Sequence, residues 1–352
     1  AAQTSFAGDI RSEYSALDRR DRDGSESSNE ELRGRVRLGF SSTLERGWSA
    51  RVRVAARWST GSNHGLDWHT QMPQSGGLVA GQASFDELQL GWNGERFGLR
   101  VGRLQTRADL PDVMGKTLTR KDSPSTEVTW TDGVELNFRH GDWLQQLILQ
   151  RNADGGASNV LRAPLDFSRD GSRVGYSWIM SSKAALGPLD FRGLQLVYLP
   201  DALASDGLAS TRREDYLALS LRASATWPLA GGSRFQLAGE LGHALTTPTR
   251  SSLRLGTSGD SGGLALQASA NWLEFASQQA LALVYGRADA GWLISPDFQP
   301  NMDLVELRWQ WTPAKHSAVE ARWRRREDLD LRSDRGLTRI DRDVYVRYTY
   351  KF

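Results

Sequence analysis

Apolar and polar residues alternate with a period of two along most of this 352-residue chain. In the segment 32–40, Leu32, Val36 and Phe40 fall on one face, and arginines fall on the other. The same alternation returns at 48–58, 134–138, 174–180, 217–227, 235–241, 264–272, 305–311, 319–323 and 344–352. Strict alternation predicts β-strands with one apolar and one polar face. The segments run roughly 10–13 residues, against about 5–6 in typical soluble strands.

Short turns alternate with long polar connections between these strands. The long connections are expected at 18–30, 59–81, 108–126, 152–171, 200–213, 246–261, 291–301 and 331–339. Together with the short turns they predict about 16 strands. The range is roughly 14–18, because 143–151 and 189–198 are apolar on both faces in places and their strands are hard to count. This arrangement is typical of an all-β, transmembrane, antiparallel up-and-down β-barrel, with short periplasmic turns and long extracellular loops. We expect residues 1–352 to form one barrel domain.

Composition excludes several other classes of protein. The mean hydropathy of −0.50 is too low for a bundle of membrane helices, each of which needs about 20 apolar residues. A net charge of +2 does not favour nucleic-acid binding, and without cysteine there is no thiolate chemistry. We expect no metal and no cofactor. A soluble β-sandwich or propeller would also alternate, but the dense arginine face would leave its core unfilled.

The end of the chain resembles the last strand of Gram-negative outer-membrane proteins. Val344, Val346, Tyr348 and Tyr350 alternate toward Phe352. This resemblance implies insertion by the barrel-assembly machinery into the bacterial outer membrane, with lipid and lipopolysaccharide as surroundings. The segment 88–105, LQLGWNGERFGLRVGRLQ, resembles the hairpin that precedes the third loop of general porins.

In porins the third long loop folds inward and narrows the pore. By count that loop is 108–126 in this chain, although it lacks the Pro-Glu-Phe-Gly-type acidic stretch of the general porins. The resemblance therefore makes inward folding a hypothesis, and it leaves monomer and trimer both open. The candidates for a constriction are Asp109, Asp112, Lys116, Arg120 and Lys121.

Arginine is concentrated on the strand faces that should line the barrel. The predicted pore-lining residues are Arg33, Arg35, Arg37, Arg51, Arg53, Arg57, Arg100, Arg322, Arg324 and Arg347, with the carboxylates Glu87 and Glu135. A barrel of this size leaves an aqueous channel, whose selectivity follows the lining charges. The sequence predicts a porin for passive diffusion of small hydrophilic solutes that favours anions. Alternatively, the arginines form salt-bridge ladders that only rigidify the wall.

Two other functions stay open. A sugar-specific channel would stack sugars on aromatic side chains, for which Phe85 and Tyr345 have the lumenal parity, while Trp68 and Trp292 fall in long loops. A barrel lipase or protease would need a histidine near the rim, such as His243 with Ser251 or Ser252. We expect the protein not to be an enzyme, because His243 has the lipid-facing parity.

Overall fold

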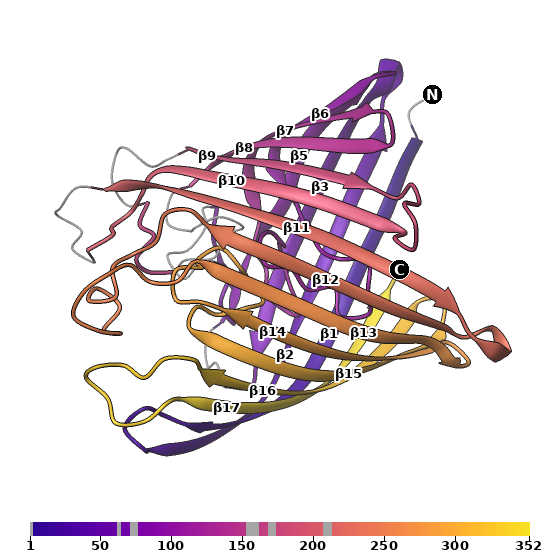
Figure 1. Ribbon diagram of the computed structural model, residues 1–352. Coiled ribbons are helices and arrows are strands. Elements are labelled where there is room, and N and C mark those ends of the chain that lie inside the picture. Colours follow the sequence, from indigo (N-terminus) through magenta and orange to yellow (C-terminus); the bar gives the residue numbers. More distant parts are fainter. Residues whose placement is uncertain (1–2, 62–64, 71–76, 153–161, 168–173, 207–212) are drawn as a thin grey trace.

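The strands close into an antiparallel barrel (Figure 1). The computed structural model describes residues 3–61, 65–70, 77–152, 162–167, 174–206 and 213–352. Within these ranges, sixteen long strands form the barrel wall: β1 (Gln3–Arg20), β2 (Glu26–Thr43), β3 (Trp48–Ser59), β5 (Gln82–Asn93), β6 (Phe97–Leu104), β7 (Thr131–His140), β8 (Trp143–Arg151), β9 (Val174–Ser182), β10 (Phe191–Leu203), β11 (Glu214–Pro228), β12 (Arg234–Ala244), β13 (Leu264–Ala276), β14 (Gln279–Ala288), β15 (Met302–Ala314), β16 (Ser317–Asp328) and β17 (Ile340–Lys351). The two-residue β4 (Asp67–Trp68) pairs in parallel with β5. The predicted barrel of about 16 strands is confirmed.

The first and last strands pair and complete the barrel. Glu13 of β1 lies opposite Arg347 of β17, and the backbone amide of Gly8 donates to the carbonyl of Phe352 at 2.9 Å. Closure leaves no unpaired sheet edge, which a structure surrounded by lipid requires. It also places the arginine-rich strands β2 and β3 on the same side of the barrel as β16 and β17.

The outer face carries an apolar band. Leu90 and Val346 are among its exposed side chains, at 56% and 54% exposed. Aromatic pairs lie at the short-turn ends of strands, as where Trp92 and Phe97 have ring centroids 5.1 Å apart. An outward apolar band bordered by aromatic side chains is what a transmembrane barrel presents to lipid. Separately, none of the helices among the described residues is long and apolar enough to cross a membrane.

One predicted loop is wrong. The stretch 18–30 continues two paired strands, in which Asp18 lies opposite Ser28 and Arg20 opposite Glu26, so only 21–25 form the turn. The polar composition misled the prediction, because strand pairing uses backbone groups and needs no apolar face beyond the membrane. The other predicted long connections occur within a few residues of their expected bounds, although 62–64, 71–76, 153–161, 168–171 and 207–212 within them lie outside the described residues.

Part of the barrel interior is filled by apolar packing. Trp292, Leu293 and Ile294, in the connection between β14 and β15, are fully buried against residues that include Leu118 and Leu199. The segments that looked apolar on both faces owe this to inward residues such as Ile148 of β8, which is buried with Ala108. Open space in the lumen is therefore displaced toward the arginine-rich strands.

Candidate functional site

The connection 105–130 between β6 and β7, called here the inner loop, folds into the barrel. Its carbonyl oxygens accept hydrogen bonds from the barrel wall, including that of Met114 from Arg308 at 3.0 Å and that of Pro111 from Gln236 at 3.0 Å. The carbonyl of Leu118 accepts from the indole of Trp292 at 2.8 Å. The sequence made inward folding of this loop a hypothesis, and in the structure the loop does fold into the barrel.

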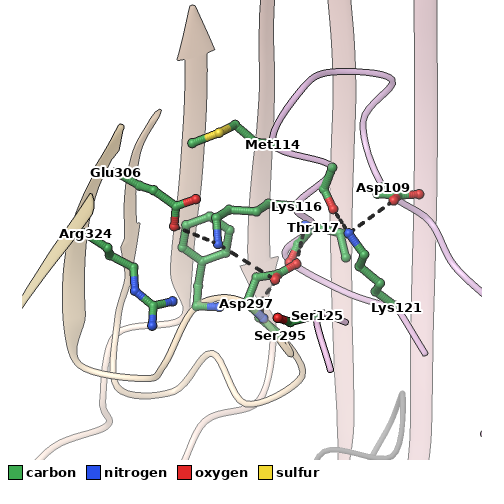
Figure 2. A network of polar contacts seen from close by, with 12 residues as sticks. Asp109, Met114, Lys116, Thr117, Lys121, Ser125, Ser295, Asp297, Glu306 and Arg324 are labelled. Atoms are coloured by element: carbon green, nitrogen blue, oxygen red, sulfur yellow. Dashed lines mark hydrogen bonds and ion pairs between the residues drawn. The ribbon is translucent and has the colours of Figure 1, made fainter. Parts of the chain in front are cut away.

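Lys116 joins the inner loop to the barrel wall (Figure 2). Its Nζ lies 3.1 Å from Oε2 of Glu306 on β15 and 3.9 Å from Oδ1 of Asp297. Asp297 also accepts from the backbone amide of Thr117 at 3.0 Å. Burial lowers the pKa of Lys116 to about 8, against the attraction of Glu306 and Asp297. The ammonium group is therefore charged at neutral pH. Its contacts with Glu306 and Asp297 hold the inner loop against the barrel wall.

The carboxylates of the inner loop are bound mainly by neutral groups. Asp112 accepts from the hydroxyl of Ser269 at 2.8 Å, and burial raises the pKa of this carboxyl. Asp122 accepts from the hydroxyls of Thr106 at 3.1 Å and Thr131 at 2.9 Å. Asp109 is the exception, with Lys121 of the same loop at 3.4 Å. None of these contacts neutralises the arginines of the wall.

Instead, the loop meets the arginines with backbone carbonyls. Arg35 of β2 donates to the carbonyls of Ser123 at 3.3 Å and Glu127 at 3.0 Å. Arg11 of β1 donates to the carbonyl of Ser125 at 2.6 Å. A carbonyl satisfies a guanidinium donor but does not cancel its charge. The counter-charge of these two arginines is Asp9 of β1, whose Oδ1 lies 3.0 Å from Arg35 and 3.7 Å from Arg11.

Carboxylates on the strands of the wall form ion pairs with the arginines, on the side away from the lumen. Glu13 accepts from Arg33 at 2.7 Å, and Asp343 accepts from Arg324 at 2.8 Å. Glu13 is fully buried, while the side chain of Arg33 remains 32% exposed. Each pair therefore presents its positive end to the lumen. The predicted salt-bridge ladders exist, and they do not exclude a positive surface.

A β-bulge in β5 adds a carboxylate that the sequence pattern missed. Arg53 lies opposite Glu87 but Val54 lies opposite Phe85, so Asp86 is the extra residue. Asp86 and Glu87 consequently both point inward, and Asp86 lies 2.8 Å from Arg37 and 2.8 Å from Arg53. The prediction that Phe85 faces the lumen is wrong, because the bulge reverses the parity beyond it. Two adjacent carboxylates within a strand were the available signal.

A cavity of about 1040 Å³, called here the lumen cavity, lies between the inner loop and the arginine wall. Among the described residues, thirteen arginines, three lysines and seven carboxylates line it. Most predicted site residues are brought together there: Arg33, Arg35, Arg37, Arg51, Arg53, Arg100, Arg322, Arg324, Arg347, Glu87, Asp109, Asp112, Lys116 and Lys121. Arg308 also lines it, and its inward parity was the signal that could have identified it.

Three predicted residues lie elsewhere. Arg57 donates to the carbonyl of Leu78, and Glu135 is buried in the wall, where its Oε1 accepts from Arg100 at 3.1 Å. Arg120 is buried behind the inner loop, where it donates to the hydroxyls of Thr106 and Thr131. Their contacts are those of side chains that hold loops and strands together.

The aromatic candidates form no platform in the lumen. Trp292 is fully buried, Tyr345 is enclosed between Arg322 and Arg347, and Trp68 packs against the outward-facing Phe85 at 5.0 Å. For the enzyme alternative, His243 lies opposite Leu219 and Leu264 on the outer face, and Ser252 donates to Thr249 in its own loop. The described residues contain no group of three or more histidines and carboxylates that could hold a metal ion.

Solved structures of outer-membrane proteins have this fold. OprB of Pseudomonas putida aligns over 99% of this chain and 94% of its own, with a TM-score of 0.65 and 8% identity. An anion-selective porin from Comamonas acidovorans aligns over the full length of both chains, with a TM-score of 0.60 and 11% identity. Pseudomonas aeruginosa OpdQ aligns over 99% and 98%, with a TM-score of 0.56 and 12% identity. No family model and no curated protein matches the chain.

Proposed function

We propose that this protein is a channel of the bacterial outer membrane, through which small hydrophilic solutes diffuse passively and anions pass in preference to cations. The outward apolar band and the likeness to outer-membrane porins support the location and the class. The observation that carries the anion preference is the lumen cavity, whose lining has sixteen cationic side chains and seven carboxylates.

The physical basis of the preference is the order of charges across the wall. The guanidinium group of Arg33 is more exposed than its buried partner Glu13, and the inner loop adds carbonyl oxygens, not further negative charge, to Arg11 and Arg35. A constriction with low-dielectric walls concentrates the field of its lining charges and raises the local concentration of counter-ions. Arginine stays charged at every physiological pH, so the field is permanent.

The test is the reversal potential of the purified protein in planar bilayers under a KCl gradient. We expect a potential of the sign set by chloride, decreasing as the salt concentration rises because the Debye length shortens from about 10 Å at 0.1 M to about 3 Å at 1 M. A clear preference for potassium would refute the proposal.

Arg51 and Arg53 provide the matched variant. Arg51 is 48% exposed and lies 3.4 Å from Glu87, and Arg53 lines the same cavity. Replacing both with serine, Arg51→Ser and Arg53→Ser, should lower the anion preference several-fold. The control is Arg96→Ser in the short turn between β5 and β6, which removes the same kind of charge away from the cavity. Equal effects of the two changes would mean that the lumen arginines are only structural.

A further inference from the structure

A second cavity, of about 400 Å³, lies among the connections at the long-loop end of the barrel. We call it the loop cavity. Five arginines from four separate parts of the chain line it: Arg22, Arg162, Arg254, Arg332 and Arg339. No carboxylate belongs to this lining in the part of the chain that the structure describes. Like charges that converge on one space repel each other, and carboxylates outside the lining pair with only some of these five arginines.

Three of these arginines are held in place by neighbouring side chains. Arg22 makes a two-pronged contact with Asp328, at 2.5 Å and 2.8 Å. Arg254 donates to Asp334 at 2.7 Å. Arg339 donates to Oε1 of Gln299 at 2.9 Å. Asp328 and Asp334 thus fix the guanidinium groups of Arg22 and Arg254, and neither carboxylate belongs to the lining of the cavity.

The other two arginines have no ion pair among the described residues. Nε of Arg162 donates to the carbonyl of Ser295 at 2.9 Å, and burial lowers the pKa of its guanidinium to about 10, so it remains charged at neutral pH. Nε of Arg332 is buried and has no hydrogen-bond partner within the described ranges. A buried guanidinium donor without an acceptor is unfavourable, and an oxyanion supplies both acceptors and the opposite charge.

The loop cavity adjoins the lumen cavity. Gln299 lines both of them, and Arg339 holds its side-chain amide at the boundary. The two cavities therefore lie next to each other at Gln299, with arginines lining both.

We propose that the loop cavity is a separate binding site for small oxyanions, solutes whose phosphate or carboxylate groups the guanidinium forks of Arg162 and Arg332 bind. Binding itself is independent of conduction. Only the order of events, capture in the loop cavity before passage through the lumen cavity, rests on the proposed channel function.

Calorimetric titration of the full-length protein in detergent with inorganic pyrophosphate tests the site. The variant Arg162→Gln with Arg332→Gln should weaken binding at least tenfold, and Arg51→Ser with Arg53→Ser should leave this binding in place. The control is Arg335→Gln, which removes an exposed charge from the same connection as Arg332 but outside the cavity. Unchanged binding in the double variant, or loss only in the lumen variant, would overturn the proposal. If the double variant does not fold, Arg332→Gln alone replaces it, with at least a threefold loss expected.

A bilayer measurement separates this inference from the proposed function. Pyrophosphate added at the long-loop side should block chloride current at lower concentration than from the short-turn side, and the double variant should remove this difference. A protein that conducts anions but binds pyrophosphate independently of Arg162 and Arg332 retains the channel function and loses the site. A protein that does not conduct but shows binding that depends on these arginines retains the site and loses the channel function.

Discussion

Nζ of Lys116 lies 3.1 Å from Oε2 of Glu306, and this contact joins the inner loop to the far side of the barrel wall. The loop leaves the wall after β6 and returns at β7, whereas Glu306 belongs to β15, which is seven strands from β6 in one direction around the barrel and eight from β7 in the other. Both side chains are almost completely buried, at 3% and 0% exposed. The width of the lumen thus depends on an ion pair inside it.

Replacing Lys116 with methionine should loosen the inner loop and widen the channel. The change removes the contacts of Nζ with Glu306 and Asp297, while Glu306 keeps Arg308 as a partner. We expect a higher single-channel conductance and more current noise in planar bilayers. The free energy of unfolding should change little at neutral pH, because the cost of burying the ammonium group offsets its attraction to the two carboxylates. Unchanged conductance and noise in Lys116→Met would contradict this role.

The stability contributed by Lys116 should rise with pH between about 8 and 10.5. Burial lowers its pKa to about 8 in the folded protein from 10.5, so over this range the unfolded chain holds a proton that the folded protein has lost. Stability increases with pH wherever the unfolded state binds more protons. The groups facing Lys116 are Glu306, Asp297, Arg308 and Arg324. Urea unfolding of wild type and Lys116→Met across this range isolates the effect; parallel pH profiles would show that Lys116 does not titrate there.

Neutralising the bulge residue, Asp86→Asn, should increase the anion preference while lowering stability. Arg37 and Arg53 both lie 2.8 Å from this carboxylate. The change therefore removes one negative charge that both arginines share. Removing one member of a buried pair costs about 3–5 kcal/mol. Reversal potentials and denaturant unfolding measure the two effects. Asp132→Asn is the control: it removes the partner of Arg103, which does not line the lumen cavity, so selectivity should stay unchanged.

Trp292→Ala should loosen the inner loop. The side chain is fully buried, and its indole donates to the carbonyl of Leu118 at 2.8 Å. Truncating a buried tryptophan costs about 3–5 kcal/mol, and here a loop carbonyl also loses its donor. Thermal unfolding should move to lower temperature and conductance should rise. Trp311→Ala on the outer face, where the ring is 38% exposed, should change conductance little. Similar conductance changes in both variants would contradict the role of Trp292.

The barrel and most of its lining could be predicted because a strand has only two faces. Once Leu38 is placed toward lipid, Arg37 must point inward, and this holds for each strand without knowledge of its neighbours. The inward position of Asp86 was not predicted, because a β-bulge is defined by how a strand pairs with its neighbour. Nothing in the local pattern around Phe85 requires an extra residue; the pairing with β3 does.

The inward folding of the loops could not be predicted from the alternation of apolar and polar residues. Segments 105–130 and 289–301 have no period that ties them to a face, and their positions follow from packing against strands distant in sequence, as between Trp292 and Leu118. Arg120 shows the consequence: its charge marked it as a constriction residue, but the loop turns it toward Thr106 and Thr131, away from the lumen cavity.

Alternation along the chain therefore decided the fold class, the lipid-facing side and the arginines available to the lumen, because strand geometry is local. Tertiary structure alone decided which groups surround each charge. Barrel closure brought β1 to β17, the bulge added Asp86, and the inner loop met Arg11 and Arg35 with carbonyl oxygens. Whether an arginine is neutralised depends on the group that lies a few ångströms away, and residues remote in sequence supply that group.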